Sequence, residues 1–376
     1  MVAARAGVSR TTVSFVLNAR AGSGIAAATR ARVLAAAREL GYVPSAAARS
    51  LVSGRTLTVG FVVCDARHLL TDAYLPQAIF TLTQVAHARG FRVLVEAVDD
   101  PERPAAYQAL VRSARIDGMV VMNPRREDAQ LAELIDSRYP VVTIGRPPSE
   151  RGHMLDVDNV AAVQDATAHV LQAGRRRIAH LGYGSPRYAT VAERRAGYRA
   201  ALAAAGVATD ERLVTFGNYS ADSGAAAMRS LLQRLGHRPG GPAPFDALVC
   251  GNDTVALGAL TALREVGLRV PADVAVVGFD DIPMAAHAAP PLTTVRMPLL
   301  AMGEAAGHLL LELLESGPRE REARLLPTQL VVRASCGARC ASAAGSADEG
   351  VMRRDAHASV ASHEHEAGTA RGAPRR

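Results

Sequence analysis

The stretch SRTTVSFVLN, residues 9–18, carries side chains that could contact a nucleic acid. On a helical wheel, Val13, Val16 and Leu17 form one apolar stripe. An arginine can pair with guanine through two hydrogen bonds, hydroxyls can bond bases or phosphates, and an aromatic ring can meet a thymine methyl group. The side of the helix opposite the stripe holds such side chains: Arg10, Thr11, Ser14, Phe15 and Asn18. The alternative for Phe15 is that it packs against another helix.

A second set of polar side chains follows apolar, β-branched runs farther along the chain. Open α/β sheets bind ligands at the carboxyl ends of their strands, so these side chains are candidates for a ligand site. They are Asp65, Asn123, Arg146, Asn218, Tyr219, Asn252, Asp253, Asp280 and Asp281.

Two helices should position the side chains that could contact a nucleic acid. Gly7 supplies a tight turn and Ser9 a cap before the helix that carries Arg10. A second helix over about 29–40 is expected to stop at Gly41, a residue favoured just past a helix end. Its predicted buried residues are Val33, Leu34, Ala37 and Leu40.

Eight apolar runs should form the strands that position the candidate ligand-binding side chains. Strands that alternate with helices indicate βαβ units and parallel sheet. Eight runs exceed one ordinary sheet, and they separate into two blocks at about Asp156. We therefore predict an α/β fold with two lobes, each a doubly wound parallel sheet. The runs are TVGFVV, FRVLVEAV, DGMVVM, PVVTIG, RIAHLGY, RLVTFG, ALVCGN and VAVVGFDD.

Charge is concentrated at the start of the chain. Residues 1–55 hold eight arginines and one acid, Glu39, which gives +7, the formal net charge of the whole protein. A small basic segment on a near-neutral body is expected of a nucleic-acid-binding module, because arginines neutralise phosphates.

Several separate motifs resemble the LacI/GalR family of transcriptional regulators. They are VAARAGVSRTTVSFVLN, TRARVLAAARELGYVP, SAAARSL, VGFVV, RRAGYRAAL, CGNDTVALGAL and LRVPADVAVVGFDDIPMAAHAAPPLTTVRMP, and they span about residues 2–333. The resemblance implies a helix-turn-helix head over residues 1–43, and a hinge helix and linker over 44–55. It also implies a periplasmic-binding-protein-like core over 56–335 that forms a homodimer and binds an effector. Residues 336–376 have no apolar period, and we expect a disordered tail.

The family correspondence assigns base contacts to Arg10, Thr11 and Phe15. It places Leu51 as a wedge in the minor groove, where contacts of the bent DNA offset the unstacking of a base step. The alternative for Leu51 is an ordinary core position. The expected DNA-binding residues are Ser9, Arg10, Thr11, Thr12, Ser14, Phe15, Asn18, Ser45, Ala48 and Leu51.

The same correspondence assigns effector contacts to Arg194, Tyr219, Asn252 and Asp280, with Tyr74 and Asp158 added from the first lobe. A guanidinium, an aromatic face, an amide and a carboxylate suit a polyhydroxylated ring, so a sugar or a related metabolite is expected. Structural alternatives remain for three of them: Asp280 as a cap, Asn252 in an Asx turn, and Arg194 as a surface charge.

The resemblance implies a repressor whose affinity for double-stranded operator DNA responds to a sugar-like effector. A solute-binding protein would share the core, but the basic head and the lack of a signal peptide argue against it. An enzyme is not expected, because GYGSP lacks the third glycine of a dinucleotide loop, and no GxSxG, Walker or HExxH motif occurs. No apolar run reaches the ~18 residues of a membrane span, so we expect a cytoplasmic protein without a membrane partner.

No cofactor or metal is expected. Cys336 and Cys340 are spaced as CxxxC, and His363 and His365 are separated by one residue, unlike the ligands of zinc ribbons.

Compared with the first helix of the LacI/GalR family, the first helix of this chain is short, with about five residues from Val2. We expect a start codon assigned too late; the alternative is a true truncation that weakens DNA binding.

Overall fold

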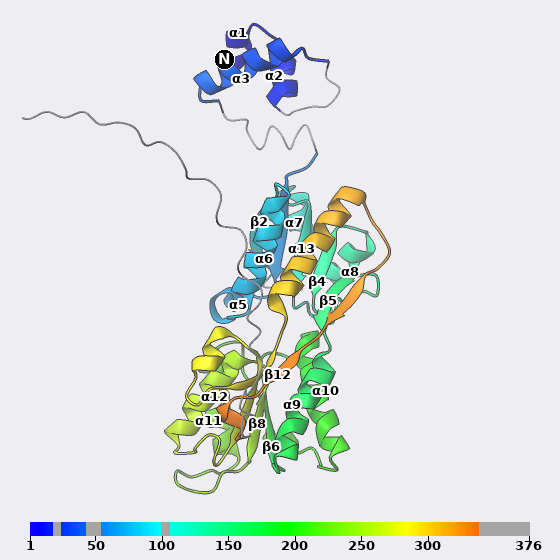
Figure 1. Cartoon of the computed structure of the whole chain (residues 1–376). Coiled ribbons are helices and arrows are strands. Elements are labelled where there is room, and N and C mark those ends of the chain that lie inside the picture. The colour runs from blue at the N-terminus through cyan, green and yellow to red at the C-terminus, as the bar shows by residue number, and fades with distance from the viewer. Residues whose placement is uncertain (18–23, 43–53, 99–105, 338–376) are drawn as a thin grey trace, which may run out of the picture. The chain divides into compact units, whose positions relative to one another are not determined.

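The computed structural model describes residues 1–17, 24–42, 54–98 and 106–337 (Figure 1). Four predicted DNA-binding residues lie outside these ranges: Asn18, Ser45, Ala48 and Leu51. Most of the predicted hinge stretch and the chain after Gly337 also lie outside them.

The head contains three described helices, α1 (Val2–Ala6), α2 (Arg10–Leu17) and α3 (Ala27–Glu39). Gly7 turns the chain with a positive φ of 64°, which a glycine adopts without strain. The Ser9 hydroxyl accepts a hydrogen bond from the Thr12 amide at 3.1 Å, so Ser9 caps α2 as predicted.

The three helices enclose a small apolar cluster, which includes Val2, Val13, Val16 and Val33. The prediction for the last helix was partly wrong, because Leu34 and Leu40 are exposed. In α3 the buried stripe is Val33, Ala36 and Ala37, which matches the i, i+3, i+4 spacing of one helix face.

The first lobe is built on a six-stranded parallel sheet. Its strands are β11 (Ala323–Leu326), β5 (His153–Val157), β4 (Val141–Ile144), β3 (Gly118–Met122), β1 (Thr58–Val63) and β2 (Arg92–Ala97), in that order. Its described helices are α5 (Ala66–Thr71), α6 (Leu75–Ala88), α7 (Ala106–Arg112), α8 (Ala129–Asp136) and α13 (Leu299–Ser316). Central strands such as β3 are buried throughout, as expected of a parallel sheet covered on both faces.

The second lobe is built on another six-stranded sheet, parallel except where β12 runs antiparallel to β10. Its strands are β12 (Gln329–Val331), β10 (Thr293–Arg296), β9 (Ala275–Asp280), β8 (Ala247–Cys250), β6 (Ile178–Gly182) and β7 (Val214–Phe216), in that order. Its helices are α9 (Asn159–Gln172), α10 (Ala189–Ala204), α11 (Ala221–Arg234) and α12 (Asp253–Glu265), with short 3₁₀ turns at Glu211–Leu213, Pro283–His287 and Ala334–Cys336.

The chain passes between the two sheets three times: after β5, after β10 and after β11. The predicted division at about Asp156 is therefore incomplete, because α13 and β11 return to the first lobe.

All eight apolar runs predicted to be strands form strands. The sequence missed β5, β10, β11 and β12, which are short and mix polar or charged residues with apolar ones. Cys336, assigned by sequence to the tail, is buried in the last 3₁₀ turn, 3.3 Å from His169 Nε2.

None of the described helices is long and apolar enough to cross a membrane.

Replacing Gly258 with alanine should destabilise the second lobe. A Cβ at Gly258 of α12 would lie 1.8 Å from the Ala221 carbonyl oxygen of α11. Alanine is favoured in helices by ~1 kcal/mol, but overpacking costs ~1–3 kcal/mol, so the free energy of unfolding should fall. The matched control is Ala226→Gly on the exposed side of α11, which should cost about 1 kcal/mol through helix propensity alone. Urea unfolding followed by circular dichroism tests both; a more stable Gly258→Ala protein would contradict the packing argument.

Candidate functional site

The start of α2 presents the predicted DNA-binding face. Ser9, Arg10 and Thr11 are exposed. The hydroxyls of Ser9 and Thr12 lie 2.9 Å apart and share a hydrogen bond. Phe15 is half-buried and lies outside the apolar cluster of the head. This face therefore offers a guanidinium and hydroxyls near a helix N-terminus, the arrangement that suits phosphate and base contacts.

The head keeps most of its positive charge unneutralised. Within its described residues the one ion pair joins Arg5 of α1 to Glu39 of α3, with Nε–Oε2 at 2.9 Å. Arg10 and Arg32 are exposed and have no carboxylate partner in the described part of the chain. Exposed arginines of this kind attract phosphate, so the described part of the head presents part of the positive charge expected from the sequence.

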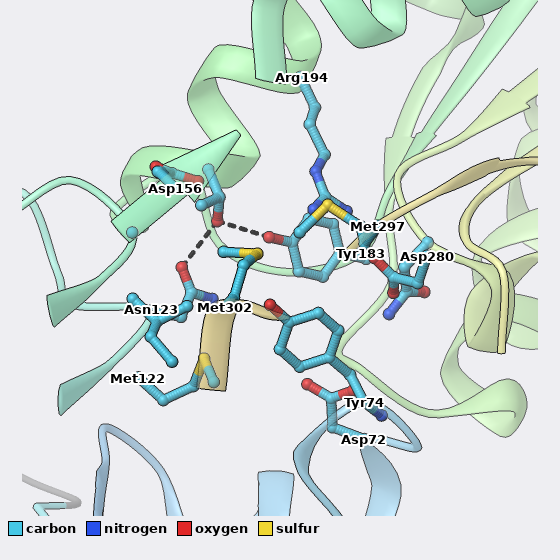
Figure 2. Close-up of a pocket in the computed structure, with 14 residues that line it drawn as sticks. Asp72, Tyr74, Met122, Asn123, Asp156, Tyr183, Arg194, Asp280, Met297 and Met302 are labelled. Atoms are coloured by element: carbon cyan, nitrogen blue, oxygen red, sulfur yellow. Dashed lines mark hydrogen bonds and ion pairs between the residues drawn. The ribbon is translucent and has the colours of Figure 1, made fainter. Parts of the chain in front are cut away.

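A pocket in the core receives side chains from both lobes (Figure 2). The first lobe contributes residues around β3, β4, β5 and the start of α6, and the second contributes the ends of β6, β8 and β9 with α10. The lining residues are Asp72, Tyr74, Met122, Asn123, Ile144, Gly145, Asp156, Tyr183, Thr190, Arg194, Asn252, Asp280, Met297 and Met302. The carboxyl ends of strands from the two sheets thus face one cavity, as the sequence predicts.

Arg194 is buried at this pocket and is not a surface charge. Its Nη1 donates to the Gly251 carbonyl at 2.5 Å and lies 3.4 Å from Asp280 Oδ1, while Nε donates to Asn159 Oδ1 at 3.0 Å. The guanidinium lies 3.7 Å from the centre of the Phe279 ring. These contacts fix the direction of the guanidinium, and within the described chain Nη2 has no hydrogen-bond partner.

Asn252 and Asp280 lie at the ends of neighbouring strands of the second lobe. Asn252 is the cap of α12, and its Oδ1 accepts from the Val255 amide at 3.0 Å. The Asn252 oxygen is therefore engaged as a helix cap rather than in the Asx turn offered as the alternative, while the same residue lines the pocket. Asp280 has a φ of 113°, outside the usual range for a residue with a side chain. Burial raises the pKa of Asp280 well above its ordinary value, against the opposing effect of Arg194.

Two carboxylates of the first lobe line the same pocket. Asp156, buried in β5, accepts hydrogen bonds from the Val157 amide at 2.8 Å and from Asn159 Nδ2 at 3.1 Å. Burial raises its pKa to about 7. Asp72 accepts from the Tyr74 amide at 3.0 Å, and burial raises its pKa to about 6. Both groups can accept hydrogen bonds from a ligand when they are ionised.

Hydrogen bonds join the lobes beside the pocket. Asn123 of the first lobe donates from Nδ2 to the Tyr219 hydroxyl at 2.7 Å, and its Oδ1 accepts from the Thr190 hydroxyl at 2.7 Å. The Tyr183 and Thr190 hydroxyls lie 2.5 Å apart. Farther out, the Arg126 amide donates to the Arg187 carbonyl at 2.9 Å. The lobes are therefore in direct contact around the cavity.

Two residues expected to hold the effector lie outside the pocket lining. Tyr219 is buried, and its ring faces His68, with ring centres 3.6 Å apart. Asp158 is exposed and caps α9 by accepting from the Ala161 amide at 2.9 Å. The carboxylate that reaches the pocket from this segment is Asp156, two residues earlier.

Sequence reasoning missed Asp72, Asp156, Tyr183 and Thr190 as pocket residues. Tyr183 directly follows a correctly predicted strand, so its position was a usable signal. Asp156 lies within a strand that the sequence did not reveal. Nothing in the local sequence of Asp72 or Thr190 distinguishes them, because they reach the pocket through the packing of the lobes.

About 440 Å³ of space lies between the lining atoms, part of it open to solvent, but the free cavity is only about 40 Å³. A sugar would need the lining to move. Three methionines, Met122, Met297 and Met302, border the cavity, and their flexible side chains can adapt to a ligand. Among the described residues, no group of three His, Cys, Asp or Glu side chains is placed to hold a metal ion.

Two protein-family models match the chain. Residues 2–45 match bacterial regulatory proteins of the lacI family, and residues 167–336 match the periplasmic binding protein-like domain. The first match contains α1, α2 and α3. The second contains Arg194, Asn252 and Asp280.

Whole-chain comparisons agree with these matches. The transcriptional regulator CelR of Thermobifida fusca is 39% identical over 343 residues, which cover 89% of this chain and 97% of CelR. A solved complex of CelR with cellobiose superposes with a TM-score of 0.67 at 36% identity, covering 89% of this chain and 98% of that one. The lac repressor dimer bound to operator and an anti-inducer superposes with a TM-score of 0.75 at 28% identity, covering 89% and 97%. The chain belongs to the LacI family of bacterial regulatory proteins.

Proposed function

We propose that this protein is a sequence-specific transcriptional repressor whose affinity for operator DNA is controlled by a sugar bound between the two core lobes. The observation that carries this proposal is the combination, in one chain, of a basic helix-turn-helix head and a pocket built around the buried Arg194. The similarity to CelR over 89% of the chain supports both parts.

The proposed mechanism rests on a pocket shared by two lobes. A ligand that contacts Asp72 and Asp156 on one side and Arg194 and Asp280 on the other favours one separation of the lobes over another. The start of the core is tied to the first lobe, because Asp117 accepts hydrogen bonds from the amides of residues 56 and 57 at 2.7 and 2.8 Å. A movement of that lobe therefore moves the end of the linker that follows the head.

For DNA, we propose base contacts by Arg10, Thr11 and Phe15, with the hydroxyls of Ser9, Thr12 and Ser14 near phosphates. Exposure of the first turn of α2 supports this assignment. The proposal extends to four residues outside the described ranges: Asn18, Ser45, Ala48 and Leu51.

For the effector, we propose direct contacts from Arg194, Asn252, Asp280 and Tyr74, all of which line the pocket, and we add Asp72 and Asp156. For Tyr219 we propose a contact that requires His68 to move from its ring. Asp158 has weaker support, because it is exposed and engaged as a helix cap.

We propose the domain limits 1–43, 44–55, 56–335 and 336–376, and a homodimer. The dimer is supported by the lac repressor structure, and by exposed apolar residues of the first lobe, among them Leu69, Leu70, Phe80 and Val95. We place the protein in the cytoplasm with its DNA and assign it no catalytic activity, since its relatives are transcriptional regulators.

The central test is linkage between the two ligands. Operator DNA would be selected from a randomised pool, and its affinity measured with and without cellobiose. Each ligand must change the affinity for the other by the same factor. A sugar that binds the core and leaves operator affinity unchanged would contradict the regulatory mechanism and leave the fold untouched.

Arg10→Ala should weaken binding to the selected operator and relax the preference at one base pair. A bidentate contact to guanine contributes ~1–3 kcal/mol, which corresponds to roughly 5- to 150-fold in affinity. Arg32→Ala on the exposed side of α3 is the charge-matched control and should weaken all sequences equally. Fluorescence anisotropy against single-base variants of the operator measures both; an unchanged preference in Arg10→Ala would exclude base reading by this residue.

Phe15→Ala should likewise lower the discrimination between bases at one position of the operator, measured in the same way.

Arg194→Gln should weaken effector binding at least about tenfold, because a hydrogen bond to a charged group contributes ~1.5–3 kcal/mol. Arg199→Gln is the control, since Arg199 lies on the same helix but forms an exposed ion pair with Glu211. Calorimetric titration with cellobiose compares the two variants. Equal affinities would show that the guanidinium does not touch the ligand.

The raised pKa of Asp156 should make the ligand-free protein less stable as the pH rises. The pKa is about 7 in the folded protein against about 3.9 in an unfolded chain, so between those values the unfolded chain releases the proton first. Stability should therefore be higher near pH 5 than at pH 8, by roughly 1.4 kcal/mol for each pH unit between pH 5 and the pKa of the folded protein. Asp156→Asn should reduce this decline, as seen in melting temperatures at the two pH values. A decline as steep as that of the unmodified protein would rule out Asp156 as its source.

A further inference from the structure

The effector pocket has more negative than positive groups among its described lining residues. Three carboxylates, Asp72, Asp156 and Asp280, surround it, and Arg194 is its one cationic side chain. Figure 2 shows the three carboxyl groups around the cavity rather than gathered at one point. With all groups ionised, the state that a bound cation favours, the lining has a formal charge of −2.

Arg194 does not balance these acids. Its ion pair is with Asp280, at 3.4 Å, and its shorter hydrogen bonds go to a backbone carbonyl and an amide oxygen. In the described chain, neither Asp72 nor Asp156 has a guanidinium or an imidazole within ion-pair distance. Each of these two accepts hydrogen bonds through one carboxylate oxygen from neutral N–H groups, and the other oxygen has no described partner.

The neighbouring Asp281 shows that the fold supplies cations to buried acids elsewhere. Its two oxygens pair with Arg296 at 2.7 Å and Arg333 at 2.6 Å. Asp253, buried outside the pocket, has both oxygens occupied by the Thr294 hydroxyl and the Ile282 amide. The pocket acids differ from both, since their free oxygens face a cavity.

A second observation comes from Tyr74, which is 9% exposed and lines the same cavity. Its hydroxyl has no hydrogen-bond partner in the described chain. Burial raises the pKa of this hydroxyl, as do Asp280, Asp156 and Asp72, against the opposing effect of Arg194; the hydroxyl thus shares the cavity with all four charged groups. An aromatic ring beside carboxylates suits a cation, because the ring face attracts positive charge.

We infer that the effector is an amino sugar whose protonated nitrogen is bound among Asp72, Asp156 and the Tyr74 ring. This inference rests on the proposed function and narrows its ligand class. An ammonium group has three donors and a positive charge, and it would supply what the free carboxylate oxygens lack. The ring hydroxyls remain for Arg194, Asn252 and Asp280. Binding would lower the pKa of Asp72 and Asp156 toward ordinary values, because an adjacent cation favours their ionised form.

The test compares three disaccharides with the same β-1,4-linked ring geometry on the full-length protein at pH 7. Cellobiose carries hydroxyls at C2, the glucosamine dimer carries ammonium groups there, and the N-acetylglucosamine dimer carries neutral amides. We expect the glucosamine dimer to bind at least tenfold more tightly than cellobiose in calorimetric titrations. Acetylation should remove this advantage, because it removes the charge.

Substitutions of the two pocket acids test where the protonated amine is bound. Asp72→Asn and Asp156→Asn should each reduce the affinity ratio of the glucosamine dimer to cellobiose, whereas Asp222→Asn, an exposed acid in the first turn of α11, should leave the ratio unchanged. The comparison of ligands needs no variant, so it stands even if a substituted protein fails to fold. Cellobiose binding as tightly as the glucosamine dimer would overturn this inference and leave the proposed function intact. No binding of any of the three would contradict both the inference and the proposed sugar class.

Discussion

The buried guanidinium of Arg194 is the constraint on which the core depends. Burying a charge costs several kcal/mol unless hydrogen bonds and an opposite charge compensate it. Gly251, Asn159 and Asp280 provide those contacts, and they come from the residue after β8, the start of α9 and the end of β9. Three separate elements of the second lobe are thereby held around one side chain, and the groups that they leave uncommitted point into the cavity.

The first lobe meets this arrangement through polar groups as well as through apolar clusters that contain residues of both lobes. Asn123 bonds both Tyr219 and Thr190, while Asp72 and Asp156 face the same cavity as Arg194. Polar contacts of this kind can be exchanged for ligand or water at modest cost, because each contributes only ~0.5–1.5 kcal/mol net. The pocket is therefore placed where a small molecule can change the balance between two arrangements of the lobes.

The head is stabilised by other interactions than the core. Its apolar cluster is small, with alanines providing much of the contact between α1 and α3, and an exposed ion pair of Arg5 with Glu39 joins the same two helices. Exposed pairs contribute little to stability, so a head of this size depends on its few buried valines. Of its described arginines, Arg10 and Arg32 are exposed to solvent, a position that suits phosphate contacts rather than packing.

The sequence alone determined the helices of the head, the eight principal strands and the division into two lobes, because periodicity and β-branched runs report burial along one segment. It also marked Arg194, Asn252 and Asp280 through their family motifs. Only the tertiary structure decided that α13 and β11 return to the first lobe, that Asp156 rather than Asp158 reaches the cavity, and that His68 covers Tyr219. These outcomes depend on contacts between residues far apart in the chain, such as Tyr219 and His68, which are 151 positions apart, and no local pattern records such contacts.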